Sequence, residues 1–392
     1  MSDRHAKKTQ GGSFGEGLVK RDYRSFDFLL ALAAVALAVF GVIIIGSATR
    51  ATLGGDAPAF HTMQKFWVAS GVIILLAAAF VDYHFISRFY IIIYAFSIAL
   101  LVLVLFMSAN DTTGTARWIR FAGFNFQPSE FSKLAMILFL SYYIEKFDEQ
   151  LNRPLVLLLT LALIFLPVAL IAVQPSMSEA IVVSALSFGI MFAGKLSYKY
   201  IIPVVALVVP LVSLVYYDLT RPTPFIGRFL QDYQLSRVML WIEPDAADPK
   251  YFQTMQSIRA IGSGLFDGKG LGNRDTVVPF VHNDFIFAVI GEELGFVGAM
   301  AVIGCILLIV LKCLLIAYRA ADVNGRLIAT GAAVMLAFQS FVHIGVATGA
   351  LPNTGTPLPF ISYGGSSMWV CMAAVGLCIN VGMTKSKGFF DE

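Results

Sequence analysis

The residues best suited to chemistry lie between Val278 and Gly295, where polar side chains directly precede a long apolar run. His282, Asn283 and Asp284 follow a proline, which favours a loop at this point. From Phe285 onward the chain is apolar except for a pair of glutamates. A carboxylate at such a boundary is partly desolvated, and this raises its pKa toward the range of a general base. Asp284 is therefore the candidate catalytic residue.

A second interpretation of Asp284 remains open at this point. An aspartate just before a helix can cap that helix by accepting hydrogen bonds from the backbone of Ile286 or Phe287. His282 can tune the carboxylate or simply face water. The residue pattern allows both the base and the cap.

Two more groups of polar residues border apolar runs. Glu130 and Lys133 are three residues apart, which places them on one helix face as an ion pair where a lone charge is costly. The pair can line a substrate cavity or hold two helices together. Arg117 can bind phosphate, or it can anchor the chain at the interface beside Trp118. Both alternatives stay open for both groups.

The composition indicates that membrane helices position these residues. Of 392 residues, 58% are hydrophobic and only 14% are charged, against about 25% charged in soluble domains. Crossing a bilayer takes about 20 apolar residues per helix, so we expect an all-α polytopic protein and not a barrel. The net charge of +3 is too small to imply a nucleic-acid partner, and the four cysteines lie in apolar runs without metal or disulfide spacing.

Ten apolar runs predict ten transmembrane helices. They lie near residues 26–48, 66–81, 89–107, 129–144, 155–173, 177–194, 201–217, 285–318, 327–347 and 366–383. The run at 285–318 is long enough to include an interfacial or re-entrant piece. Pro203 and Pro210 predict a bend in the seventh helix.

An even number of spans places both termini on one side, and the bias of Lys and Arg identifies that side as the cytoplasm. Residues 1–25 are polar and basic, and we expect a disordered cytoplasmic arm. A single membrane domain covers 26–383, and residues 384–392 form a cytoplasmic tail. The long connection 218–284 then lies on the extracellular side of the cell membrane, together with Asp284.

The segment from Leu351 to Ser367 is too rich in Pro and Gly for a spanning helix, yet apolar enough to be buried. Irregular backbone at membrane depth is tolerated where protein or a water-filled cavity surrounds it. We therefore expect this segment to form a cavity wall, with Ser362 and Tyr363 lining the site.

These pieces, in this order, resemble the SEDS family (shape, elongation, division and sporulation). The matching motifs are Gly114-Thr-Ala-Arg-Trp-Ile119, Gln127-Pro-Ser-Glu-Phe-Ser-Lys133, Gly262-Ser-Gly264 with Gly268-Lys-Gly-Leu-Gly272, His282-Asn-Asp-Phe-Ile-Phe-Ala288 with Gly291-Glu-Glu-Leu-Gly295, and Pro357-Leu-Pro-Phe-Ile-Ser-Tyr-Gly-Gly-Ser-Ser367. The resemblance implies a peptidoglycan glycosyltransferase that polymerises lipid II with a class B penicillin-binding protein, in elongation, division or sporulation. It also implies that Asp284 matches the family's essential aspartate, and Glu130 and Lys133 its buried polar pair.

In the reaction implied, a sugar hydroxyl displaces a lipid diphosphate, with Asp284 as base. The leaving group needs a cation, from the protein or from a divalent ion, although no carboxylate cluster marks a metal site. The candidate substrate-binding residues are Arg117, Gln127, Ser129, Glu130, Lys133, Lys269, His282 and Ser362. A lipid II transporter and a non-catalytic scaffold of the cell-wall machinery are the alternative functions.

The chain departs from the family pattern at three places. Phe280 stands where a glutamate is usual, and His343 replaces an asparagine of the ninth span. The segment from Ser176 to Glu179 lacks the usual aspartate, for which Glu179 is a candidate substitute.

Overall fold

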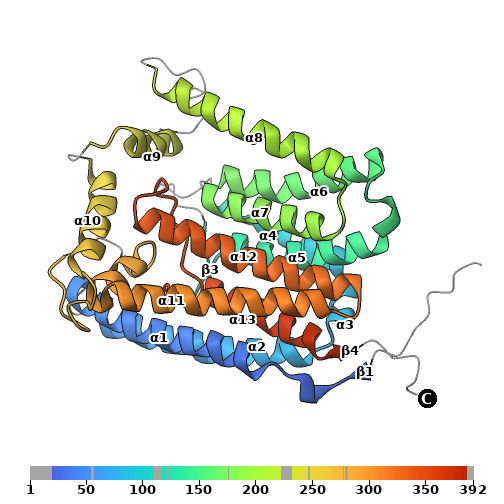
Figure 1. Ribbon diagram of the computed structural model, residues 1–392, viewed down its shortest axis with the longest axis horizontal. Helices are drawn as coiled ribbons and strands as arrows, with labels where there is room; N and C mark the ends of the chain where they lie inside the picture. Colours follow the sequence, from blue (N-terminus) through green and yellow to red (C-terminus); the bar gives the residue numbers. More distant parts are fainter. Residues whose placement is uncertain are drawn as a thin grey trace, which may run out of the picture.

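The protein is a bundle of long helices, seen in the computed structural model of Figure 1. The structure describes residues 20–53, 57–108, 117–121, 124–174, 176–221, 232–245, 248–276, 278 and 281–385. Helix α8 lies at one edge of the bundle, and α1 and α2 lie at the opposite edge (Figure 1).

Each of the ten predicted apolar runs corresponds to a helix. Their bounds are α1 Phe28–Leu53, α2 Ala57–Phe80, α4 Tyr90–Ser108, α5 Pro128–Lys146, α6 Pro154–Val173, α7 Met177–Ala193, α8 Tyr198–Leu219, α11 Ile286–Arg319, α12 Val323–Ala347 and α13 Gly365–Gly382. Within the described residues, seven are long and apolar enough to cross a membrane, namely α1, α2, α4, α6, α11, α12 and α13. The chain is therefore an all-α, multi-pass membrane protein. Pro203 and Pro210 both lie inside α8.

Helix α13 occupies the core of the bundle, where it packs against α2, α12, α11 and α5. Its small residues let neighbouring backbones approach closely. At Gly376, an added Cβ would lie 2.4 Å from the carbonyl oxygen of Leu75 on α2. This close contact aligns α2 with α13, and the N-terminal parts of both helices line the candidate site.

Short elements connect the long helices. The turn α3 (Tyr83–Arg88) follows α2, the hairpin β2 (Ile119–Phe121) and β3 (Phe124–Phe126) precedes α5, and η3 (Asp148–Gln150) follows it. The long connection expected as a loop contains two helices, α9 (Asp232–Ile242) and α10 (Pro249–Ser263). These helices were not predicted.

Part of the arm expected to be disordered is ordered. Strand β1 (Lys20–Arg21) pairs antiparallel with β4 (Thr384–Lys385), and η1 (Tyr23–Ser25) leads into α1. Arg21 explains this order, because its guanidinium donates to Asn380 Oδ1 at 2.7 Å and lies 3.6 Å from Asp82. The expectation of disorder is therefore wrong for residues 20–25, while residues 1–19 and 386–392 lie outside the described residues.

Helix α11 is interrupted in its first third by a kink. Gly295 interrupts it with φ 63° and ψ −161°. The segment after α10 satisfies carbonyl groups near the break: the backbone N–H groups of Lys269 and Gly270 donate to the oxygens of Glu292 and Glu293, at 3.0 and 2.8 Å. The break thus ties the connection 264–276 to the helix that follows Asp284.

Candidate active site

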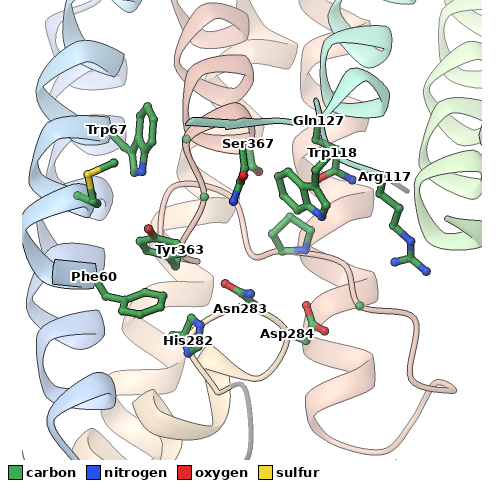
Figure 2. Close-up of a pocket in the computed structure, with 16 residues that line it drawn as sticks. Phe60, Trp67, Arg117, Trp118, Gln127, His282, Asn283, Asp284, Tyr363 and Ser367 are labelled. Carbon is green, nitrogen blue, oxygen red and sulfur yellow. The ribbon is translucent and has the colours of Figure 1, made fainter. Parts of the chain in front are cut away.

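A pocket of about 510 Å³ opens beside Asp284 (Figure 2). Its walls come from α2, from the hairpin region before α5, from the turn before α11 and from the segment before α13. The lining residues are Phe60, Met63, Trp67, Arg117, Trp118, Asn125, Gln127, His282, Asn283, Asp284, Gly355, Pro357, Tyr363, Gly364, Gly365 and Ser367. Aromatic and polar side chains therefore share one cavity at one end of the bundle.

Asp284 is the one acidic residue among these described lining residues. Burial raises the pKa of its carboxyl group, while the positive charges of Arg237 and Arg117 oppose that rise. The alternative that Asp284 caps α11 is not borne out, because the cap residue is Phe285 and no described side chain caps the helix. The carboxylate faces the pocket instead (Figure 2).

The irregular segment 351–364 lies directly behind Asp284. Gly355 has φ +72°, and a Cβ there would be 3.2 Å from Asp284 Oδ2. Only glycine adopts this conformation at no steric cost, and its lack of a side chain leaves room for the carboxylate. The expected cavity wall is thus confirmed, and Gly355 lies close to the acid.

Side chains from α7 and α12 satisfy polar backbone groups of this wall. Ser178 Oγ donates to the oxygen of Thr354 at 3.0 Å. His343 Nδ1 lies 2.7 Å from the oxygen of Thr356, and since a carbonyl only accepts, this nitrogen carries the proton. Both donors come from places where the chain departs from the family pattern, and both support the wall.

A buried ion-pair network also supports this wall. Lys133 Nζ lies 2.8 Å from Glu130 and 2.9 Å from Glu179, and all three side chains are nearly inaccessible to solvent. Lys133 also donates to Gln339 Oε1 at 3.0 Å, and Gln339 Nε2 donates to the oxygen of Pro357 at 3.0 Å. The predicted pair is confirmed, and Glu179 joins it as a second acid. The network contacts the pocket wall but does not line the pocket.

Three other candidate residues hold the pocket together. Ser362 Oγ accepts from the N–H of Leu358 and donates to the oxygen of Asn283, both at 2.8 Å. Gln127 lines the pocket and donates through Nε2 to Ser129 Oγ at 3.0 Å. Ser362 and Ser129 are buried and do not line the cavity.

His282 lines the pocket between two aromatic rings. Its ring lies 5.0 Å from that of Phe60 and 5.9 Å from that of Tyr363. Burial lowers the pKa of His282, so the neutral ring is favoured. The neutral imidazole can donate or accept a hydrogen bond in the cavity without adding charge beside Asp284.

Lys269 is not brought to the pocket. Its ammonium lies 2.8 Å from Glu292 and 3.0 Å from Asp275, and these contacts raise its pKa. Nearby, Arg274 pairs with the buried Glu293 at 3.2 Å. These basic residues neutralise the glutamates of α11 that would otherwise be unpaired. Phe280, the remaining departure from the family pattern, lies outside the described residues.

Sequence reasoning missed several residues of the site. Phe60, Met63 and Trp67 line the pocket from one face of α2, but they look like any apolar residues of a spanning helix. Arg237 lies on α9, whose apolar residues Leu235, Val238, Met239 and Ile242 follow helical spacing. That spacing is the sequence signal that could have predicted α9, and with it Arg237 as a candidate residue.

Within the described residues, no group of three or more His, Cys, Asp or Glu side chains has the arrangement of a metal site. Asp284 and the two arginines that act on it are the charged groups of the candidate site.

Comparisons with known proteins cover nearly the whole chain. The FTSW_RODA_SPOVE family model, described as cell cycle protein, matches residues 26–387. The chain is 32% identical over 383 residues to the probable peptidoglycan glycosyltransferase FtsW of Geobacter sp. (strain M18), covering 94% of this chain and 99% of that protein. It is also 32% identical over 363 residues to the peptidoglycan glycosyltransferase MrdB of Escherichia coli (strain K12), covering 91% and 93%.

The fold is also similar to that of solved structures from this group of proteins. A chain from a peptidoglycan synthase complex that coordinates polymerization and crosslinking is similar with a TM-score of 0.75 and 27% identity, over 91% of this chain and 97% of that one. The rod shape determining protein RodA of Thermus thermophilus is similar with a TM-score of 0.67 and 26% identity, over 92% and 97%.

Substitution of different residues in the buried network should lower the stability of the protein by different amounts. We expect Lys133→Met to destabilise the protein by about 3–5 kcal/mol, because two carboxylates then share a buried site without a cation. Glu179→Gln removes one acid and leaves the Lys133–Glu130 pair, so its cost is smaller. Thermal unfolding of purified protein in detergent measures both.

The matched control is the neutral triple variant Glu130→Gln, Lys133→Met, Glu179→Gln. It contains no unpaired charge, so it recovers most of the stability lost in Lys133→Met. If the triple variant melts no higher than Lys133→Met, the destabilisation does not come from buried charge.

Proposed function

Because the chain belongs to the FtsW, RodA and SpoVE family of cell cycle proteins, we propose that it is a peptidoglycan glycosyltransferase with Asp284 as its catalytic base. The observation that carries the proposal is the placement of the Asp284 carboxylate in a pocket, under the influence of two arginines. A lone acid among aromatic and amide side chains suits removal of a proton from a sugar hydroxyl.

The proposed substrate is lipid II, a disaccharide attached to a lipid diphosphate. A sugar hydroxyl of one molecule attacks the anomeric carbon of the next, forming a glycosidic bond while the bond to the diphosphate breaks. Asp284 accepts the hydroxyl proton, and the lipid diphosphate leaves with the bonding electrons. A single displacement of this kind inverts the anomeric centre and needs no covalent enzyme intermediate.

Arg117 and Arg237 both favour the ionised base in this mechanism, and Arg117 also binds the leaving group. Their positive charges oppose the effect of burial on Asp284, which keeps more of the base in its ionised form. A guanidinium also binds phosphate oxygens in a forked geometry, so Arg117 in the pocket wall is suited to the departing diphosphate. Gln127 and Asn125 add amide groups that can hold the sugars.

We place the pocket on the extracellular side of the membrane. It lies near the start of α5 and α11, whereas Lys146 and Arg319 lie in the last turns of the same two helices. Basic residues at that far end favour the cytoplasm. The proposed orientation therefore gives the enzyme its substrate at the surface where the wall is built.

We propose a class B penicillin-binding protein as the partner. The support is indirect: a similar chain belongs to a peptidoglycan synthase complex that coordinates polymerization and crosslinking. The transporter alternative loses its main support, because Lys133 pairs with Glu130 and Glu179, and none of the three lines the pocket at Asp284.

Asp284→Asn tests the assignment directly. The amide keeps the shape of the side chain and removes the base, so polymerisation of purified lipid II should fall by about 10²- to 10⁴-fold. The assay compares the two proteins with and without the class B partner and a divalent ion, at equal lipid II binding. Equal polymerisation by folded Asp284→Asn and the parent protein would place the base elsewhere.

The pH dependence of polymerisation should depend on Arg117. Activity requires the carboxylate, so the rate rises with pH through the pKa of Asp284, which burial holds above its ordinary value. Arg117→Gln removes a charge that favours the carboxylate, so the acid limb of the profile should move to higher pH. Arg117→Lys keeps the charge and should leave that limb near its original place. An unmoved acid limb in Arg117→Gln contradicts the electrostatic role.

A further inference from the structure

A second pocket, of about 550 Å³, lies on the other side of α2 and shares no lining residue with the pocket at Asp284. Neighbouring residues of α2 point to different cavities: Phe60 lines the Asp284 pocket and His61 lines the second one. The opposite wall comes from α1, where Ile43, Ser47 and Arg50 recur at helical spacing. The glycosyltransfer mechanism uses none of these residues.

Arg50 gives the wall of this second pocket a positive charge. Arg50 lies in the last turn of α1 and makes no ion pair or hydrogen bond with any residue that the structure describes. Arg50 and His61 both line this pocket, and Lys65 follows His61 by about one helical turn on α2. Arg50 and His61 are thus available donors in the wall of one cavity.

Glu293, the acid that contacts the lining residue Ser47, does not cancel this charge. Ser47 Oγ donates to Glu293 at 2.5 Å, and Arg274 lies 3.2 Å from the same carboxylate. Arg274 also donates to the oxygen of Ala48 at 2.7 Å. Glu293 is therefore neutralised inside the protein, and the exposed surface of the pocket keeps a net positive charge from the described side chains.

The rest of the pocket wall is apolar and open. Ile43 is 50% exposed on a spanning helix, and Leu271 is 54% exposed on the connection that packs against α11. A cationic donor at the end of a spanning helix, with exposed apolar side chains beside it, matches a molecule with a phosphate head and a hydrocarbon tail. Arginine binds phosphate oxygens in a forked geometry, and a histidine adds another donor.

We infer that this second pocket is a lipid-phosphate site, with Arg50 and His61 binding the phosphate of a membrane lipid and Ile43 contacting its chain. The inference rests on the membrane-embedded fold and does not depend on glycosyl transfer. The phosphate can belong to a glycerophospholipid or to a polyprenyl diphosphate, because both carry anionic phosphate oxygens next to a hydrocarbon chain.

Native mass spectrometry of the full chain, released from detergent, measures retained lipid. The probes are phosphatidylglycerol, a polyprenyl diphosphate, and diacylglycerol, which lacks the phosphate. We expect the double variant Arg50→Gln, His61→Gln to bind at least one phosphate lipid about tenfold more weakly than the parent, while diacylglycerol binding stays unchanged. The phosphate lipid that loses affinity identifies the source.

The matched control is Arg319→Gln, which removes an exposed arginine from the last turn of α11, as Arg50 is in the last turn of α1. It should retain both lipids like the parent. Arg50→Lys with native His61 keeps the charge and should retain most of the binding, which separates lost charge from misfolding. The proposal is overturned if the double variant retains both phosphate lipids like the parent, or if diacylglycerol binds the parent as tightly as they do. Asp284→Asn should retain the lipid like the parent. The binding result can therefore be interpreted even if Asp284 is not the catalytic base.

Discussion

The structure depends on satisfying an irregular stretch of backbone at membrane depth. The segment 351–364 contains prolines and glycines and cannot form a helix, yet all of its residues are buried or half-buried. Each unpaired polar group of such a segment would cost several kcal/mol in an apolar environment. Ser178, His343 and Gln339 supply donors from α7 and α12. The wall behind Asp284 is therefore held by two neighbouring helices.

This constraint explains why charges are buried outside the pocket. Lys133 orients Gln339, and Gln339 donates to the wall at Pro357. A buried ammonium needs counter-charges, which Glu130 and Glu179 provide. The ion network thus has a structural effect on the site through one amide side chain, although none of its members touches the cavity.

Sequence reasoning found the features that depend on local spacing. The apolar runs identify the ten long helices, and the interval between Glu130 and Lys133 identifies their ion pair. It did not find features that depend on distant contacts. Lys269 faces Glu292 because the connection folds onto the break at Gly295, and no local pattern reports that contact. Phe60 and Trp67 line the pocket with the same residue types that face lipid elsewhere.

The wall at Gly355 sets the position of Asp284, and Gly355→Ala tests this claim most directly. Gly270→Ala is the control, because Gly270 also has a positive φ, +90° against +72°, but lies beside Asn273 and not the acid. The measurement is the turnover of lipid II by both variants at matched thermal stability. The account predicts a loss of about 10²-fold in Gly355→Ala alone, as expected for a displaced catalytic group. Equal turnover in the two variants would contradict it.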